Sequence, residues 1–261
     1  MFDTKGSFIP TSVHKVFSYP PSGYYKFNLE TSTDEMIDSV CSCVSNPANN
    51  IRTSFSNLHD DILRDPSLSS VLDGPFIPFC INQNASTDIG SILESDLLPS
   101  LNTSFLQEYP DAHFKVVTQD KQHLAGRLLP VTDSGYQNIL SSLNSSHLIG
   151  YYFPYAFPEF SISSQRQAFK SISTPLQICL SGPLEIVSAS ITYPSLLINT
   201  DHYSPILCMS GVRHCDQRLE AVLKSYGPHL EFWILSNVLT AGREQISEQW
   251  YGGLTIYKSL I

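Results

Sequence analysis

Charge is scarce in this chain, and the motifs of several common enzyme classes are missing. Only 15% of its 261 residues are Asp, Glu, Lys or Arg, against roughly a quarter in an average soluble domain. The sequence contains no phosphate-binding loop, no dinucleotide-binding glycine motif, no zinc-protease helix and no serine-hydrolase elbow. These absences argue against the commonest nucleotide hydrolases, nicotinamide oxidoreductases and serine hydrolases.

Basic clusters and long apolar runs are also absent. Lys and Arg number 15 without forming a cluster, and the net charge is −9. Nucleic acids and anionic membranes attract proteins through basic residues, so neither is an expected partner. No apolar run approaches the roughly 20 residues of a membrane span, and the first residues lack the basic and apolar regions of a signal peptide. We therefore expect a cytoplasmic protein.

The six cysteines fit neither a disulfide framework nor a zinc site. Cys41 and Cys43 are one residue apart, and no second pair completes a metal site. Cys80, Cys179 and Cys208 lie inside apolar runs, where a reduced thiol packs as a small core residue. The sequence therefore predicts reduced thiols and no bound metal, and it indicates no particular cofactor.

Apolar residues are plentiful and recur in a regular rhythm. They make up 42% of the chain, enough for one large domain or for a domain with an appendage. Three apolar runs end in Ser followed by Gly or Asn, at 176–182, 206–211 and 232–237. This strand–turn–helix rhythm predicts a mainly parallel, Rossmann-like three-layer α/β sheet over residues 73–261. A (β/α) barrel is the alternative.

The individual elements follow from periodicity. The spacing of Leu219, Val222, Leu223 and Tyr226 predicts a helix over 216–226, which Gly227 ends. Residues 183–193 are ambiguous between a strand and a helix. The expected strands lie at 76–81, 114–118, 148–153, 176–180, 206–210, 230–236 and 254–258, and the other expected helices lie at about 89–97, 136–143, 164–172 and 243–250.

Residues 1–72 are predicted to form an N-terminal segment that packs on this α/β domain. A hairpin is expected over 13–30 because apolar and polar residues alternate there. Helices are expected at about 34–44 and 51–62. The second helix carries an apolar stripe that is too large to leave in water.

The turn that follows the strand at 206–210 is the strongest candidate site. Ligands of parallel sheets bind at the carboxyl ends of the strands, where free N–H groups at the start of a helix attract anions. Arg213 and His214 add positive charge, Gly211 allows close approach, and Ser210 or Asp216 caps the expected helix. The alternative is an ordinary capped turn with its basic residues in solvent.

Other candidate residues are expected near the same edge. Ser181, Gly182 and Ser236 end neighbouring strands, and they are further candidates for ligand contacts. Tyr152 and Tyr155 belong to the aromatic run 151–158, which suits a ligand pocket, a protein interface or plain core packing.

Two shorter patterns have weaker interpretations. Cys215 lies at the start of the expected helix, a position that suits a nucleophilic thiol, but Ala221 stands where a phosphatase loop needs an Arg. Residues 201–203, Asp-His-Tyr, precede a strand and are interpreted as a connecting loop.

These patterns predict a protein that binds a small polar or anionic molecule at the carboxyl edge of its sheet. They define no reaction, and whether the protein is an enzyme stays open. The alternative hypothesis is a non-catalytic protein-interaction or assembly subunit of a larger complex, because few ionisable groups lie near the expected strand ends. The expected partner is thus a small molecule or a protein, and a homo-oligomer stays open.

Overall fold

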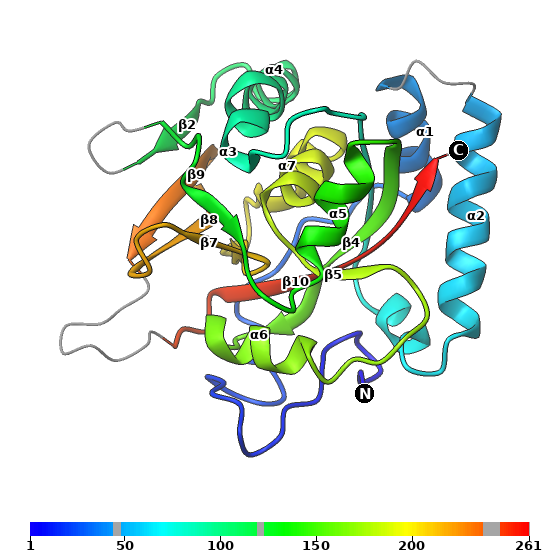
Figure 1. Ribbon diagram of the computed structural model, residues 1–261. Coiled ribbons are helices and arrows are strands. Elements are labelled where there is room, and N and C mark those ends of the chain that lie inside the picture. Colours follow the sequence, from blue (N-terminus) through cyan, green and yellow to red (C-terminus); the bar gives the residue numbers. More distant parts are fainter. Residues whose placement is uncertain (44–47, 119–122, 237–245, 261) are drawn as a thin grey trace.

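The computed structural model describes residues 1–43, 48–118, 123–236 and 246–260 (Figure 1). Its main sheet has eight strands, and two further strands form a small separate sheet. In spatial order the main sheet contains β1 (Ile77–Ile81), β4 (His147–Pro158), β10 (Trp250–Leu260), β6 (Ile206–Cys208), β8 (Leu219–Tyr226), β9 (His229–Ser236) and β2 (Phe114–Val117). In addition, β5 (Ile178–Leu180) pairs with β10, and β3 (Leu128–Pro130) pairs with β7 (Val212–His214) in the small sheet.

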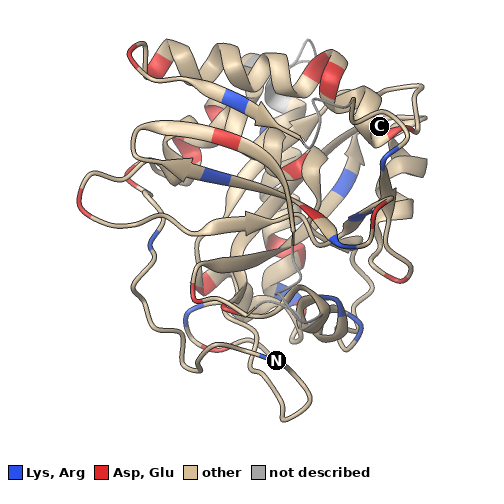
Figure 2. Cartoon of the chain, turned by 90° about the vertical axis from the view of Figure 1, so that its left-hand side faces the viewer, with Lys and Arg blue, Asp and Glu red and all other residues tan. Residues whose placement is uncertain are grey.

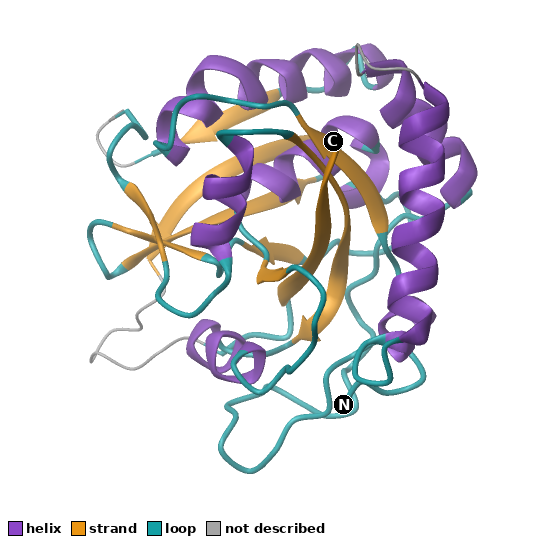
Figure 3. Cartoon of the chain, turned by 45° about the vertical axis from the view of Figure 1, so that its right-hand side comes forward, coloured by secondary structure: helices purple, strands orange, loops and turns teal. Residues whose placement is uncertain are grey.

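Seven α-helices surround these strands in the described part of the chain (Figure 3). They are α1 (Thr33–Cys43), α2 (Ala48–Arg64), α3 (Ile89–Ile92), α4 (Leu98–Glu108), α5 (Tyr136–Leu143), α6 (Ile162–Phe169) and α7 (Pro183–Thr192). A π-helical turn over Leu93–Leu97 joins α3 to α4. None of the helices within the described ranges is long and apolar enough to cross a lipid bilayer.

The main sheet is mixed and mostly antiparallel, so the prediction of a mainly parallel, Rossmann-like sheet is wrong. Among the described strand pairs of this sheet, only β10–β6 and β9–β2 run parallel. The barrel alternative also fails, because the pairing runs in an open path from β1 to β2. Continuous apolar runs were attributed to parallel strands, yet antiparallel strands buried on both faces give the same pattern. The described strands therefore share no common carboxyl edge for a ligand.

The predicted helix at 216–226 is the strand β8. It forms an antiparallel hairpin with β9 through a turn at Gly227, whose φ of +56° suits glycine. Leu219, Ala221 and Leu223 face one core cluster, whereas Val222 faces another. Both faces of this strand are apolar, so its apolar residues also match the spacing of a helix. Periodicity alone cannot distinguish a helix from a strand that is buried on both faces.

Two further predicted elements differ in the structure. No hairpin forms over 13–30, where instead Val16 bridges Phe160 and Tyr25 bridges Tyr203, so this segment lies against distant parts of the chain. The predicted helix at 243–250 lies partly outside the described residues, and its described part is a turn that leads into β10. The ambiguous segment 183–193 forms the helix α7.

The two faces of the sheet are covered unequally. On the first face, α3, α4, α5 and α7 build the largest apolar cluster against the sheet. On the second face, α2 packs on β4 and β10, at the opposite end of the sheet from β8 and β9 (Figure 1). Over β6 and β8 the second face carries only a small cluster of Ile162, Cys208, Val222 and Trp250. One half of this face is thus thinly covered.

The helix α2 belongs to residues 1–72 and shares its core with residues 73–261. Ile51, Phe55, Leu58 and Ile62 are buried in one cluster with Tyr151 of β4. The rings of Phe55 and Tyr151 lie 5.3 Å apart between centroids. The domain boundary at residue 73 itself stays a prediction.

We predict that Phe55→Ala lowers the free energy of unfolding by about 3–5 kcal/mol, because it deletes a fully buried ring and leaves a cavity. Leu63→Ala on the same helix is the matched control, since Leu63 is 52% exposed, and it should cost less than about 0.5 kcal/mol. Urea unfolding measures both values. Equal losses for the two variants would contradict the packing of α2 on the sheet.

Candidate functional site

Ser181 and Gly182 lie in the buried centre of the molecule. Glu185 of α7 accepts hydrogen bonds there from the Gly182 N–H, at 2.7 Å, and from the Tyr136 hydroxyl, at 3.0 Å. The Ser181 hydroxyl lies 2.8 Å from that of Thr255 on β10. All five residues of this cluster are fully buried, so the Ser-Gly turn holds α7 in place.

The local sequence explains this geometry. A Cβ atom at position 182 would come within 2.3 Å of the Tyr136 ring, so only glycine fits. Pro183 begins α7, and Glu185 caps the free N–H group at the start of the helix. Burial raises the pKa of the Glu185 carboxyl above its ordinary value, although the hydrogen bond from the Gly182 N–H opposes this shift.

Tyr152 borders the same cluster. An added Cβ at Gly253 would meet both the Tyr152 ring, at 2.2 Å, and the Ser181 hydroxyl, at 2.9 Å. Tyr152 is fully buried and its hydroxyl has no hydrogen-bond partner in the described part of the chain. Burial holds its pKa well above the ordinary value.

The segment 210–216 is a turn and a strand, so the basis for anion binding at a helix start is lost. Ser210 and Gly211 are buried, and the Gly211 N–H donates to the Ser181 carbonyl at 2.9 Å. Arg213 is exposed on β7, whereas the neighbouring His214 is buried. The Cys215 N–H donates to the Arg127 carbonyl at 2.8 Å. Ligand contacts from these residues stay a prediction that now lacks its structural reason.

Asp216 ends this segment, whereas Tyr155 and Ser236 belong to other strands. An ion pair with Arg218 holds the pKa of Asp216 at about 2. Tyr155 packs beside Tyr251, with ring centroids 5.7 Å apart, and burial raises its pKa to about 12. Ser236 is exposed at the end of β9. The structure thus brings Ser181, Gly182 and Gly211 together with Tyr152, but it places them in the core.

A large cavity lies instead on the thinly covered half of the sheet. It has a volume of about 720 Å³ and a mixed polar and apolar lining. Its walls are Tyr25, the loop 199–204, the β8–β9 hairpin and the start of β10 at 249–250. Four distant parts of the sequence therefore meet around it.

Hydrogen bonds tie the N-terminal segment to the loop 199–204. The Lys26 N–H donates to the Tyr203 carbonyl at 3.0 Å, and the Asn199 side-chain amide donates to the Lys26 carbonyl at 2.9 Å. The Tyr203 ring stacks on that of Tyr24, with centroids 5.5 Å apart. This wall of the cavity is therefore held in place at several points.

The β8–β9 hairpin supplies the cavity with one cation and one indole ring. The Lys224 ammonium lies 3.4 Å from a Glu231 carboxylate oxygen and 3.6 Å from the centroid of the Trp233 ring. Both charged side chains are less than one-fifth exposed, at 19% and 14%. The Trp233 indole N–H is buried and has no acceptor among the described residues. Because this N–H has almost no accessible surface, a ligand in the cavity would contact other atoms of Trp233.

Sequence reasoning missed these residues for a specific reason. The pattern at 201–203 indicates only a connecting loop, and the spacing at 216–226 predicts a helix that would include Lys224 and Tyr226. The available signal was the spacing of two residues between Val222, Lys224 and Tyr226. Side chains two residues apart lie on the same face of a strand.

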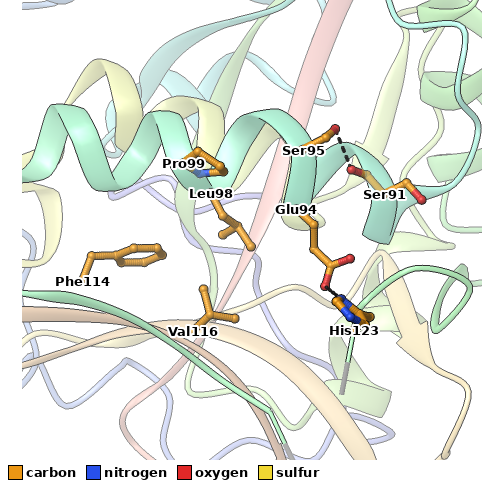
Figure 4. Close-up of a pocket in the computed structure, with 8 residues that line it drawn as sticks. All are labelled: Ser91, Glu94, Ser95, Leu98, Pro99, Phe114, Val116 and His123. Carbon is orange, nitrogen blue, oxygen red and sulfur yellow. Dashed lines mark hydrogen bonds and ion pairs between the residues drawn. The ribbon is translucent and has the colours of Figure 1, made fainter. Parts of the chain in front are cut away.

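A second cavity, of about 670 Å³, is mostly apolar (Figure 4). Leu98 of α4 and Val116 of β2 point toward each other across it, and Phe114 lies at one side (Figure 4). At the other end Glu94 extends to His123, with 3.4 Å between the carboxylate oxygen and Nδ1 (Figure 4). This cavity offers an apolar surface with few groups for polar recognition.

Comparison with known proteins adds no further information about either cavity. No protein-family model matches the chain, and neither does any curated protein or solved structure. Any function must therefore be argued from the cavities themselves.

We compare the free energy of unfolding of the wild-type protein with that of Glu185→Gln. We predict that the wild-type value minus the variant value decreases as the pH rises above about 4.5, the ordinary pKa of Glu. The folded state keeps the proton of this buried carboxyl group to a higher pH than the unfolded state does, so deprotonation on unfolding favours the unfolded chain. The amide side chain of the variant does not titrate, so the difference between the two proteins isolates this group.

Thermal or urea unfolding of both proteins between about pH 4 and pH 7 measures this difference. The many other carboxylates contribute equally to both proteins and cancel. A difference that stays constant over this range, or that grows in favour of the wild type, would show that the pKa of Glu185 is not raised.

Proposed function

We propose that the protein binds a small polar molecule in the cavity between the β8–β9 hairpin and the loop 199–204. The observation that supports this most directly is a cavity of about 720 Å³ whose walls combine aromatic rings with amide and hydroxyl groups. This volume falls within the roughly 300–1,000 Å³ of ligand sites. The proposal keeps the ligand class expected from the sequence and moves the site away from the turn at 210–216.

The lining is typical of a binding site. Tyr203, Tyr226 and Trp250 contribute aromatic surface, and Asn199 and Gln249 contribute amide groups. Ligand pockets commonly combine apolar and aromatic walls with a few well-placed polar groups. The arrangement supports binding, and we assign no reaction to it.

A cytoplasmic location belongs to the same proposal. Cys179, Cys208 and Cys215 form no disulfide in the described part of the chain. Reduced thiols are typical of reducing compartments, where disulfides are rare.

The rival proposal is a non-catalytic subunit that binds a protein, and the apolar cavity between α4 and β2 favours it. Val116, in the edge strand β2, is 45% exposed. An exposed apolar side chain beside an apolar cavity suits a protein contact. The two proposals differ in their critical residues: Val116→Asp should disrupt association with a protein, including self-association, while ligand binding at the β8–β9 hairpin persists.

We predict that Tyr203→Ala weakens ligand binding about tenfold, because it removes a ring that is worth roughly 1–2 kcal/mol of contact. Ligands are first sought by mass spectrometry of copurifying small molecules and by thermal-shift screening of polar compounds. Affinities are then measured by calorimetry. Tyr203 is 65% exposed, so its loss should leave the melting temperature of the unliganded protein nearly unchanged.

Phe17→Ala is the matched control, since Phe17 is an exposed aromatic residue, 53% accessible, that does not line the cavity. Its ligand affinity should equal that of the wild type. If polar compounds bind equally well to wild-type protein and to Tyr203→Ala, the site lies elsewhere and the proposal is wrong.

A further inference from the structure

We infer that the ligand of the β8–β9 cavity is a neutral carbohydrate, an inference that rests on the proposed function. Three features of the cavity support it: balanced charge, exposed aromatic rings at the rim, and polar groups that suit hydroxyls.

The charges of the cavity favour a neutral ligand. Lys224 is the only Lys or Arg among the described residues that line it, and its ammonium is paired with Glu231. Asp201 also lines the cavity, so an anion would meet a negative charge without a second cation. A cationic ligand would meet Lys224. Figure 2 shows that Lys and Arg are interspersed with Asp and Glu along the chain.

The aromatic rings favour a ligand with flat apolar faces. Tyr226 and Tyr203 line the cavity and are 73% and 65% exposed. Tyr24 stacks on Tyr203 at an interplanar angle of 21° and fixes the plane of that ring. Sugar rings present C–H faces that pack on such aromatic rings, while their hydroxyls point outward at the edges.

The polar groups match the hydroxyls of a sugar. Each hydroxyl both donates and accepts, so it pairs with an amide, a hydroxyl or an ammonium group. Asn199 donates its side-chain N–H groups to Lys26 and Ser204, which leaves its carbonyl oxygen as an acceptor for the ligand. The side-chain amide of Gln249, which also lines the cavity, can both donate to and accept from a hydroxyl group.

The cavity is less suited to a flat heterocycle. Heterocycles are held best between two parallel aromatic rings that are open to the ligand. Here the Lys224 ammonium covers one face of Trp233, and Tyr24 covers one face of Tyr203. Single exposed rings at an open rim suit a sugar, which needs only one stacked face.

The test measures the binding of defined ligand classes to the intact chain. A glycan array selects neutral oligosaccharides, and calorimetry then compares them with neutral nucleosides and with sugar phosphates. We expect binding of at least one neutral oligosaccharide, with an affinity that changes less than about twofold between low and high salt, because a neutral ligand carries no charge for salt to screen.

A variant series at Tyr226 locates the site. Tyr226→Ala should weaken oligosaccharide binding about tenfold, whereas Tyr226→Phe should bind like the wild type because the ring face remains. Phe17→Ala again serves as the control and should bind normally. Because Tyr226 is exposed, all three variants should melt within a few degrees of the wild type.

The possible outcomes distinguish the carbohydrate inference from the proposed function on which it rests. If nucleosides or sugar phosphates bind with the same dependence on Tyr226 and neutral oligosaccharides do not, the carbohydrate inference is overturned and the proposed function stands. If no class of compound binds, or if the Tyr226→Ala and Tyr203→Ala variants bind as tightly as the wild type, both the carbohydrate inference and the proposed function are overturned.

Discussion

The Glu185 carboxyl group lies fully buried where α5, β5, α7 and β10 meet, and its hydrogen bonds hold these elements in place. It accepts from the turn before α7 and from Tyr136 of α5. The Cys179 thiol of β5 and the Thr255 hydroxyl of β10 lie 3.4 and 3.5 Å from the same carboxylate oxygen. A buried carboxyl group is tolerable only when its oxygens are paired, so these elements must approach one another in one way.

Glycines make that approach possible. Gly182 admits the Tyr136 ring, and Gly253 admits the Tyr152 ring beside Ser181. A Cβ atom at Gly211 would come within 2.0 Å of the Leu180 carbonyl oxygen, so the turn after β6 also depends on glycine to lie against β5. The two Ser-Gly pairs thus allow close packing of neighbouring elements. The N–H groups of Ser181, Gly182 and Gly211 donate to acceptors within the protein.

The centre of the fold also determines where a site can form. The first face of the sheet carries the largest apolar cluster, under α3, α4, α5 and α7, whereas on the second face α2 packs on β4 and β10. On the other half, β8 turns Val222 inward to a small cluster and continues with Lys224 and Tyr226, which line the cavity. Along this face of β8, the side chains are therefore buried at Val222 and become accessible toward Tyr226. The loop 199–204 and the N-terminal segment close the space that remains, and this closure requires residues more than a hundred positions apart.

The sequence by itself determined most of the apolar core residues and where most elements lie. The strands at 77–81, 114–117 and 229–236 and the helix at 136–143 were predictable, because each is an apolar run or stripe with clear boundaries. Strand direction, the fate of residues 216–226 and the position of the cavity were decided only by tertiary structure. A strand buried on both faces carries no period that distinguishes it from a helix, and its direction depends on partners far along the chain. The lining residues Tyr25, Tyr203 and Trp233 share no local pattern, since only the packed sheet brings them together.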